Sequence, residues 1–276
     1  MLVRGLVAVL LAASTLVSAP AAPAGAIDGD RAKHFAGRIT ALGKNRLAGS
    51  HKEYRASSII KVALENLGYS VERQRFQIPN GDTSRNVVGR TPGTIRVVIV
   101  GHMDGVHNTE AANDNASGAA GVVEVARALR GMPGLLVAAV GAEERVVTGS
   151  SHHLGSRALV RSMTDAELAA IRLVVSLDMI AVGTVLNVSG IESSPNRSAR
   201  KLLNAADQLG YRVRYRQDSG VSDHAEFTKA GAPATLLTWR WDSCWHQPCD
   251  QLHRLNPKKL KKAARLTMVA ARAVLD

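Results

Sequence analysis

The chain has 276 residues, of which 46% are apolar, 21% charged and 4% aromatic. This length suits one large domain or two small ones, and the composition excludes a disordered or coiled-coil chain. Lysine and arginine outnumber the acidic residues by 35 to 23, for a net charge of +12. Their densest cluster, residues 258–262, has no interleaved aromatic residues on which single-stranded nucleic acid would stack. We therefore interpret the excess charge as a solvated surface and expect no nucleic-acid partner.

The first 26 residues are predicted to be a secretory signal peptide. A single charge at Arg4 precedes an apolar run over residues 5–17, and small residues follow at 24–26. A short basic region, an apolar core and a small-residue exit are typical of a cleaved export signal rather than a membrane span. Residues 27–276 are then expected to be the mature protein, soluble and secreted, with no membrane association after cleavage. We also expect it to be a monomer.

Apolar residues recur with helical or strand spacing along the rest of the chain. In chain order, the pattern predicts a helix over residues 55–67, a strand over 71–78 followed by a turn at 79–82, a strand over 94–100, a helix over 115–130, strands over 135–140 and 173–177, a helix over 194–209, strands over 211–215 and 234–238, and a helix over 257–275. Continuous β-branched runs such as TIRVVIV at 94–100 are typical of strands buried on both faces. Buried strands that alternate with helices predict an α/β sheet covered on both faces.

Candidate metal ligands follow four of the predicted strands or open the helix after one of them. They are His102 and Asp104 after the strand over 94–100, Asp114 at the start of the next helix, Glu143 and Glu144 after the strand over 135–140, Asp178 after the strand over 173–177, and His246 beyond the strand over 234–238. In α/β sheets ligands bind beyond the carboxyl ends of the strands, so we expect these segments to meet at one edge. Imidazoles and crowded carboxylates, without a thiolate cluster, favour zinc or a similar divalent ion.

The order of these residues also predicts divided roles. Two ions a few ångströms apart would share a carboxylate, which a short side chain at a helix entry such as Asp114 could supply. The adjacent Glu143 and Glu144 indicate that one carboxylate binds metal while the other takes a proton from a water molecule. A zinc ion lowers the pKa of such a water to about 7, so this chemistry works at neutral pH.

The only two cysteines, Cys244 and Cys249, lie on either side of His246. In an exported chain an even number of cysteines predicts a disulfide, and a zinc–thiolate site would need more soft ligands than are nearby. So short a ring adds only about 2 kcal/mol to stability in the loop-entropy account. We therefore expect a local clasp around His246, followed by Asp250 bonded to backbone groups or to the histidine ring.

Six motifs, in order, resemble the secreted di-zinc aminopeptidase family, which includes aminopeptidase S, bacterial leucyl aminopeptidase and aminopeptidase Y. The motifs are His102-x-Asp104, Asp114-Asn-Ala-Ser-Gly, Gly-Ala-Glu143-Glu144, Leu-Asp178-Met, Ser222-Asp223-His224-x-x-Phe227 and Cys-x-His246-Gln-x-Cys-Asp250. The likeness runs from about Asn45 to the closing helix, nearly the whole mature chain. It implies a three-layer α/β/α sandwich around a mixed, mostly parallel sheet, with a single zinc-peptidase domain.

The resemblance also implies two zinc ions per chain. His102 and Asp178 would hold one ion, Glu144 and His246 the other, and Asp114 would bridge the two. Such a site implies a hydrolase that acts on peptides with a free N-terminus.

Three further residues receive roles from the same resemblance. Glu143 would be the general base that activates water, and Asp104 would orient the ring of His102. His224 would support the substrate cleft. The resemblance therefore implies an exported zinc aminopeptidase with Glu143 at its catalytic centre.

One position departs from the family pattern. Trp245 stands where these aminopeptidases usually have a tyrosine that donates to the developing oxyanion, and an indole N–H would donate from a different place. Glutaminyl cyclases share the fold and can carry Trp-His here with a single zinc, so a cyclase is the second hypothesis. A catalytically weak or silent binding module on the same fold is the third. His152 and His153 are interpreted as structural, because only one of two adjacent residues on a helix could face the site.

Overall fold

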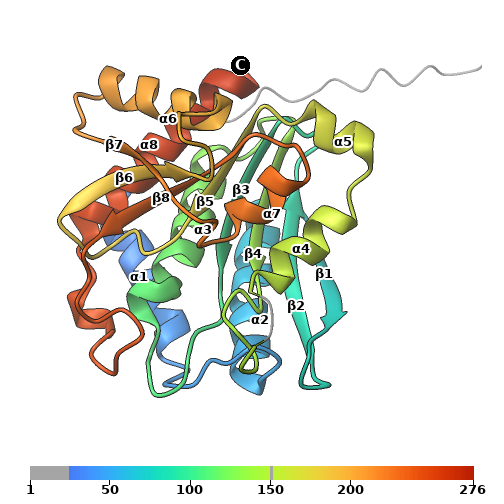
Figure 1. Cartoon of the computed structure of the whole chain (residues 1–276), viewed down its shortest axis with the longest axis vertical. Helices are drawn as coiled ribbons and strands as arrows, with labels where there is room; N and C mark the ends of the chain where they lie inside the picture. The colour runs from blue at the N-terminus through green and yellow to red at the C-terminus, as the bar shows by residue number, and fades with distance from the viewer. Residues whose placement is uncertain (1–24, 150–151) are drawn as a thin grey trace, which may run out of the picture.

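The computed structural model describes residues 25–149 and 152–276, arranged as shown in Figure 1. The signal peptide expected over residues 1–26 therefore lies outside the described residues, apart from its last two positions. Packing begins at Ile27, which is 5% exposed, and the side chain of Asp28 caps the first helix. No helix in this described part of the chain is both long and apolar enough to cross a membrane.

The described residues form strands flanked by helices. The strands are β1 (Ser70–Gln77), β2 (Thr83–Arg90), β3 (Val97–His102), β4 (Leu135–Val140), β5 (Leu173–Leu177), β6 (Val185–Gly190), β7 (Arg214–Gln217) and β8 (Ala234–Arg240). The helices are α1 (Gly29–Thr40), α2 (His51–Asn66), the π-helical segment η1 (Ala112–Ser117), α3 (Gly118–Ala128), α4 (Leu154–Arg161), α5 (Asp165–Ala170), α6 (Arg197–Gln208), α7 (His224–Lys229), the 3₁₀ turn η2 (Leu252–Arg254) and α8 (Pro257–Leu275).

One mixed sheet contains all eight strands, in the order β1-β2-β4-β3-β5-β8-β6-β7. The central strands β4, β3, β5 and β8 are parallel to one another. The flanking strands β2 and β6 run antiparallel to their central neighbours β4 and β8. Because parallel neighbours point the same way, the carboxyl ends of the four central strands reach the same edge of the sheet.

Helices cover both faces of this sheet (Figure 1). In β3, Val97 and Ile99 belong to a core formed with α1, α2, α3, α6 and α8. The intervening Val98 and Val100 belong to a second core, which is formed with α4, α5 and α7. Successive side chains of a strand point to opposite faces, so the continuous apolar run fills both cores. The predicted three-layer α/β/α sandwich is therefore confirmed.

The predicted elements are present, several with shifted ends. The strands over 135–140 and 173–177 and the helix over 257–275 have the predicted bounds. The strand predicted over 211–215 begins later, at residue 214, because the Tyr211 N–H donates to the carbonyl of Ala206 and so belongs to the end of α6.

Sequence periodicity did not predict β2, β6 or the helices α1, α4, α5 and α7. Both missed strands carry asparagines that interrupt the apolar pattern, Asn86 and Asn187, and both asparagines are buried. Asn86 donates to the side chain of Gln74 and to the carbonyl of Gly155, so tertiary hydrogen bonds make a polar residue acceptable inside the sheet.

The central strand supplies a test of the core. Ile99→Ala removes three carbons from a fully buried position of β3, and we expect the free energy of unfolding to fall by about 4 kcal/mol. Val62→Ala on α2, where the side chain is 50% exposed, is the matched control and should change it by less than about 0.5 kcal/mol. Urea unfolding followed by circular dichroism measures both. Equal losses in the two variants would contradict the assigned core.

Candidate metal centre

The predicted ligands meet at the carboxyl edge of the four central strands, among the loops at the lower edge of Figure 1. His102 is the last residue of β3, and Asp178 directly follows β5. Glu143 and Glu144 come shortly after β4, and His246 lies in the loop after β8. The parallel arrangement thus brings together side chains that are far apart in the sequence.

Asp114 lies between two histidines. Its Oδ1 atom is 3.2 Å from Nε2 of His102, and its Oδ2 atom is 3.2 Å from Nε2 of His246. Asp114 lies within η1, where it and Asn115 depart from helical φ and ψ and the peptide bond between them is cis. Each carboxylate oxygen therefore faces a different imidazole, as a bridging ligand requires.

Two further carboxylates complete the cluster. Asp178 Oδ1 is 3.5 Å from His102 Nε2, and Glu144 Oε1 is 3.0 Å from His246 Nε2. The geometry thus pairs His102 with Asp178 and His246 with Glu144, and Asp114 contacts the histidine of each pair. The cluster thus contains the side chains that the resemblance groups as ligands, and their binding of metal stays a prediction.

The chemistry of this cluster fits a divalent metal ion. Both ring nitrogens of His102 and Oδ1 of Asp178 are buried without a hydrogen-bond partner among the described residues. Ligand atoms of His102, Glu143 and Asp178 lie within 4.8 Å of one another, as do those of His102, Asp114 and Glu144. Nitrogen and carboxylate donors without thiolates match the preferences of zinc. A zinc ion would give Nε2 of His102 and Oδ1 of Asp178 the partner that they otherwise lack.

The cluster also concentrates ionisable groups in a buried place. Burial and the charge of Asp114 raise the pKa of Glu144 to about 7. Burial, together with neighbouring carboxylates, raises the pKa of Glu143 well above its usual range. Burial opposes the charge of His246, but Asp114 and Glu144 raise its pKa to about 10. The raised pKa values reflect the crowding of carboxylates, whose mutual repulsion protons or a bound cation can relieve.

Asp104 holds the backbone of the two glutamates. Its two carboxylate oxygens accept the backbone N–H groups of Glu143 and Glu144, both at 3.2 Å. Its Oδ1 atom is 3.5 Å from Nδ1 of His102, too far for a hydrogen bond. The contact that Asp104 makes is therefore to the glutamate loop, and its expected role in orienting the His102 ring stays a prediction.

Arg46 ties down the loop that joins His102 to the helix carrying Asp114. The side chain is fully buried and donates to the carbonyl oxygens of Met103 at 2.5 Å, Glu110 at 2.8 Å and Ala111 at 2.9 Å. Burial lowers the pKa of Arg46 to about 10, so it remains charged at neutral pH. One cation thus fixes both ends of the loop.

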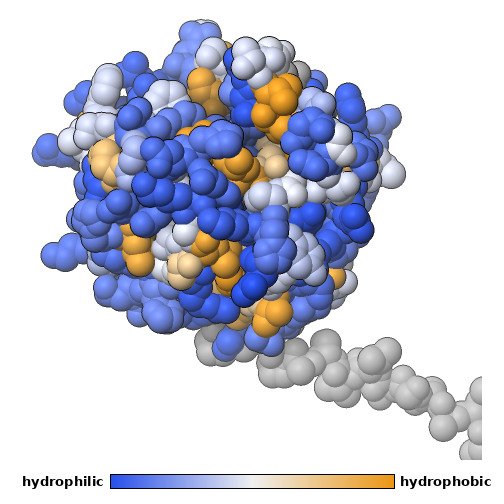
Figure 2. Space-filling view, turned by 90° about the horizontal axis from the view of Figure 1, so that it is seen from below, coloured by the Kyte–Doolittle hydropathy of each residue, from blue (hydrophilic) through white to orange (hydrophobic). Residues whose placement is uncertain are grey.

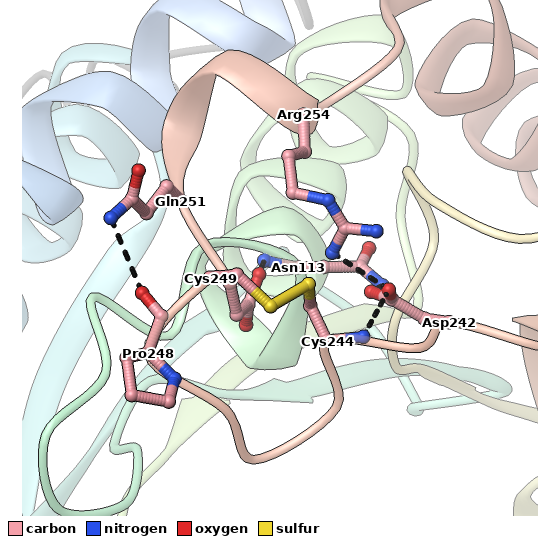
Figure 3. Close-up of a disulfide and its surroundings, with 8 residues drawn as sticks. Asn113, Asp242, Cys244, Pro248, Cys249, Gln251 and Arg254 are labelled. Carbon is pink, nitrogen blue, oxygen red and sulfur yellow. Dashed lines mark hydrogen bonds and ion pairs between the residues drawn. A yellow bond between two sulfur atoms is a disulfide. The ribbon is translucent and has the colours of Figure 1, made fainter.

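Cys244 and Cys249 form the predicted disulfide, shown in Figure 3. The ring that the disulfide closes carries His246. Before the ring, Asp242 accepts the backbone N–H of Cys244 at 2.9 Å and pairs with Arg254 at 2.7 Å (Figure 3). The ring around the histidine is therefore closed by the disulfide and also fixed by the contacts of Asp242 with Cys244 and Arg254.

Asp250, directly after this ring, joins the clasp to the bridging aspartate. Its two oxygens accept the backbone N–H groups of Asn113 at 2.7 Å and of Asp114 at 3.0 Å. The prediction that Asp250 bonds backbone groups is thereby confirmed. Through it, the loop carrying His246 and the segment carrying Asp114 are held together.

Positive φ angles occur at residues in or beside the ligand segments. Ala142 precedes Glu143 with φ of 51°, Met179 follows Asp178 with φ of 52°, and His246 itself has φ of 56°. Left-handed conformations cost non-glycine residues about 1–3 kcal/mol and persist where the surrounding structure imposes them, often at functional sites. The backbone turns sharply at these positions to present the adjacent ligands.

His153 contacts the expected general base, and it lies just outside the helix on which its structural interpretation depends. α4 begins one residue later, at Leu154, and His153 has φ of 61°. Its Nε2 atom is 3.2 Å from Oε1 of Glu143, and its backbone N–H donates to the Glu143 carbonyl at 2.9 Å. Burial and neighbouring His152 lower the pKa of His153 to about 4, so the ring is neutral at pH 7. No spacing rule indicates this contact, because it depends on how the chain returns to α4.

His224 lies deeper than its expected role implies. It is fully buried, and its Nε2 atom is 3.2 Å from Oδ1 of Asp218. The side chain is not among the residues that line the cavity beside the ligands. A supporting role behind the substrate cleft stays a prediction for this residue.

A cavity of about 420 Å³ opens beside the ligand cluster, and five of its lining residues are Asp114, Glu143, Glu144, Asp178 and His246. Most of the remaining wall is apolar, formed by Met179, Val221, Leu236, Trp239, Trp241 and Trp245. Trp245 is 56% exposed, and its ring centroid is 4.4 Å from that of His246. Figure 2 looks onto this side of the molecule, where apolar groups lie within a largely hydrophilic surface. The cavity can therefore hold an apolar group against the metal ligands.

The strand order and the imidazole and carboxylate groups at one edge of the sheet define an α/β protein with a candidate metal centre. A model of Peptidase family M28 matches residues 86–271, about two thirds of the sequence. The chain belongs to this family.

Curated relatives and solved structures agree with this assignment. Aminopeptidase YwaD of Bacillus subtilis is 28% identical over an alignment of 206 residues that covers 68% of this chain and 44% of that protein. Leupeptin-inactivating enzyme 1 of Streptomyces exfoliatus is 28% identical over an alignment of 250 residues that covers 80% of this chain and 55% of that protein. The chain thus spans about half the length of these relatives.

Two kinds of solved structure share the fold. A zinc aminopeptidase from Bacillus subtilis superposes with a TM-score of 0.83 at 18% identity, covering 91% of this chain and 96% of that one. A glutaminyl cyclase from Bacteroides thetaiotaomicron superposes with a TM-score of 0.77 at 18% identity, covering 91% and 98%. The fold alone therefore does not separate the two activities.

The disulfide provides a test of how the site is held. Replacing both Cys244 and Cys249 with serine opens the ring around His246, and we expect zinc affinity to fall about tenfold, as it does when groups that orient metal ligands are removed. Competition with a chromogenic chelator measures the affinity. Gln247→Ala, an exposed change inside the intact ring, is the matched control and should leave the affinity unchanged. Equal affinities in all three proteins would show that the clasp does not position His246.

Proposed function

We propose that this protein is an exported zinc aminopeptidase that removes N-terminal residues from peptides. The observation that carries the proposal is the position of Asp114, whose two carboxylate oxygens face His102 and His246 separately. One aspartate shared by two pairs of ligands supports two ions acting together rather than one. The carboxylate of Glu143 lies beside these pairs and is left for proton transfer.

Five side chains would hold the metal. His102 and Asp178 would bind one zinc ion, Glu144 and His246 the second, and Asp114 both. When bound, zinc polarises the scissile carbonyl group and lowers the pKa of water at the site. The absence of cysteine from the ligand set is in keeping with zinc sites that carry out chemistry.

Glu143 is the proposed general base. Its Oε2 atom lies 3.9 Å from Nε2 of His102, at the edge of the ligand cluster. A carboxylate with a raised pKa is suited to taking a proton from the attacking water and passing it to the leaving amine. His153, neutral and 3.2 Å from the other carboxylate oxygen, would hold Glu143 in one orientation without cancelling its charge.

The cavity beside the cluster suits the N-terminal residue of a peptide. Its acidic side, which includes Glu143 and Asp178, can bind the α-ammonium group of a free N-terminus. Its apolar side, which includes Met179 and Leu236, can take an apolar side chain. Trp245, at the mouth of the cavity, would offer its indole N–H to the developing oxyanion. These features favour peptides that begin with an apolar residue.

The proposal includes the organisation of the chain. Residues 1–26 would direct export and be removed, leaving a single catalytic domain over residues 27–276 that acts as a monomer. The disulfide between Cys244 and Cys249 supports folding in an oxidising compartment outside the cytosol.

The general base is tested by Glu143→Gln, which keeps the shape of the side chain and removes its basicity. We expect the kcat for leucine amide to fall by at least about 100-fold, the usual contribution of a general base. Zinc content, measured by elemental analysis, should remain two ions per chain. Glu72→Gln on β1, remote from the ligand segments in the fold, is the control and should retain activity. Full activity of Glu143→Gln would remove this residue from the mechanism.

A glutaminyl cyclase is the second candidate, favoured by Trp245 in front of His246 and by the fold shared with the solved cyclase. A peptide with N-terminal glutamine separates the two activities. We expect free glutamine to be released, because the two ligand pairs around Asp114 favour hydrolysis. Ammonia release with the peptide otherwise intact, together with one zinc ion per chain, would establish the cyclase. If neither product forms from this peptide and amino-acid amides are not hydrolysed either, the protein is a silent binding module.

A further inference from the structure

A second cavity, of about 530 Å³, opens beside Glu144 and His246. Its remaining wall comes from four loops that are distant in sequence, at residues 47–50, 80–82, 105–107 and 145–146. Among the described residues, Glu144 and His246 alone belong to the linings of both cavities. The pair of expected metal ligands therefore forms the boundary between the two spaces.

The two cavities differ in chemistry. The first has an apolar wall that contains three tryptophans. The second presents polar side chains from each of its four loops, and these are Ser50, Asn80, Asp82, His107 and Arg145. A peptide backbone in such a groove would find hydrogen-bond partners, which an apolar wall cannot offer. Its volume lies within the range of about 300–1,000 Å³ that is usual for ligand sites.

We propose that the second cavity binds the part of a peptide that follows the scissile bond, and that Arg145 binds a carboxylate there. The inference rests on the proposed aminopeptidase function. With the N-terminal residue in the first cavity, the scissile carbonyl lies at the metal ligands. Consecutive Cα atoms are about 3.8 Å apart, so the next residue passes Glu144 and His246 and enters the second cavity.

Arg145 is the permanent cation of this wall. Its Nη2 atom is 3.0 Å from Nε2 of His152, which lines the first cavity, so the guanidinium group lies near the boundary between the two. Within residues 25–149 and 152–276, Arg145 forms no salt bridge with a carboxylate, although buried Glu144 precedes it. A guanidinium group has five N–H donors in a planar fork that matches a carboxylate. The N–H donors of Arg145 that do not contact His152 can bind a ligand.

The other charged groups of the wall do not compete for this role. The carboxylate of Asp82 accepts a hydrogen bond from Nδ2 of Asn80 at 2.8 Å, within the turn between β1 and β2. His107 is exposed, and its imidazole lacks the planar fork of donors that matches a carboxylate. Outside the pair Glu144 and His246, where a bound zinc ion would add its own positive charge, Arg145 is therefore the side chain of this wall that attracts a carboxylate.

A carboxylate could come from two parts of a peptide: the C-terminus of a dipeptide, or an acidic side chain at the second position. Two substrate pairs distinguish these sources in the zinc-loaded enzyme. Leucyl-alanine compared with leucyl-alanine amide tests the C-terminal carboxylate. Leucyl-aspartic acid α-amide compared with leucyl-asparagine amide tests the side chain.

We expect kcat/KM to favour the carboxylate member of at least one pair by about tenfold, as for a hydrogen bond between charged groups. Arg145→Gln should bring that ratio close to one. Arg200→Gln on α6, which removes an exposed arginine at a distance from the site, is the matched control and should keep the unaltered ratio. Ratios near one in the unaltered enzyme, or a preference that survives Arg145→Gln, would overturn the proposal.

A binding measurement separates recognition from turnover. In the Glu143→Gln background, calorimetry should show the same preference in the Kd of the favoured pair, and its loss when Arg145→Gln is added. Leucine amide, which has no residue after the scissile bond, tells the two proposals apart. If leucine amide is not hydrolysed, the aminopeptidase proposal fails. If it is hydrolysed while the peptide pairs show no preference, only the role of Arg145 fails.

Discussion

The crowding of negative charge at one edge of the sheet is the constraint on which the rest of the site depends. Four parallel strands end at the same edge, and the segments that follow them bring carboxylates within a few ångströms of two imidazoles. Such carboxylates repel one another, and burial makes the repulsion stronger. The arrangement is stable only where cations or protons compensate the charge. The fold therefore gathers charge at a position that would be electrostatically unfavourable without such compensation.

The groups around this edge hold the backbone on which the ligands are mounted. Arg46 fixes the loop after β3, Asp104 fixes the glutamate loop, and Asp250 joins the clasp after β8 to the bridging aspartate. Each is a charged side chain that bonds backbone groups of another segment. A hydrogen bond with a charged group stabilises most when the backbone group would otherwise have no partner. The ligands thus keep their positions through a connected set of contacts.

The two cavities on either side of this centre differ in their chemistry. One side is apolar and rimmed by exposed tryptophans, and the other is polar and carries a cation. Within the part of the chain that the structure describes, the two linings share two residues, both expected metal ligands. A substrate that occupied both spaces would cross the centre with unlike parts on its two sides. The asymmetry suits an enzyme that distinguishes the end of a peptide from the chain that follows.

Local patterns in the sequence by themselves determined the central strands, the candidate ligands and the disulfide. Continuous β-branched runs predict the central strands, histidines and carboxylates that follow these strands or open the next helix predict the candidate ligands, and two cysteines predict the clasp, because each signal lies within a short segment. The contact of His153 with Glu143 and the backbone contacts of Asp104 were decided by tertiary structure alone. Such contacts join residues from different loops, whose paths depend on left-handed turns and on packing rather than on periodicity. The walls of both cavities were decided in the same way, because each wall is assembled from loops that meet only after the sheet has formed.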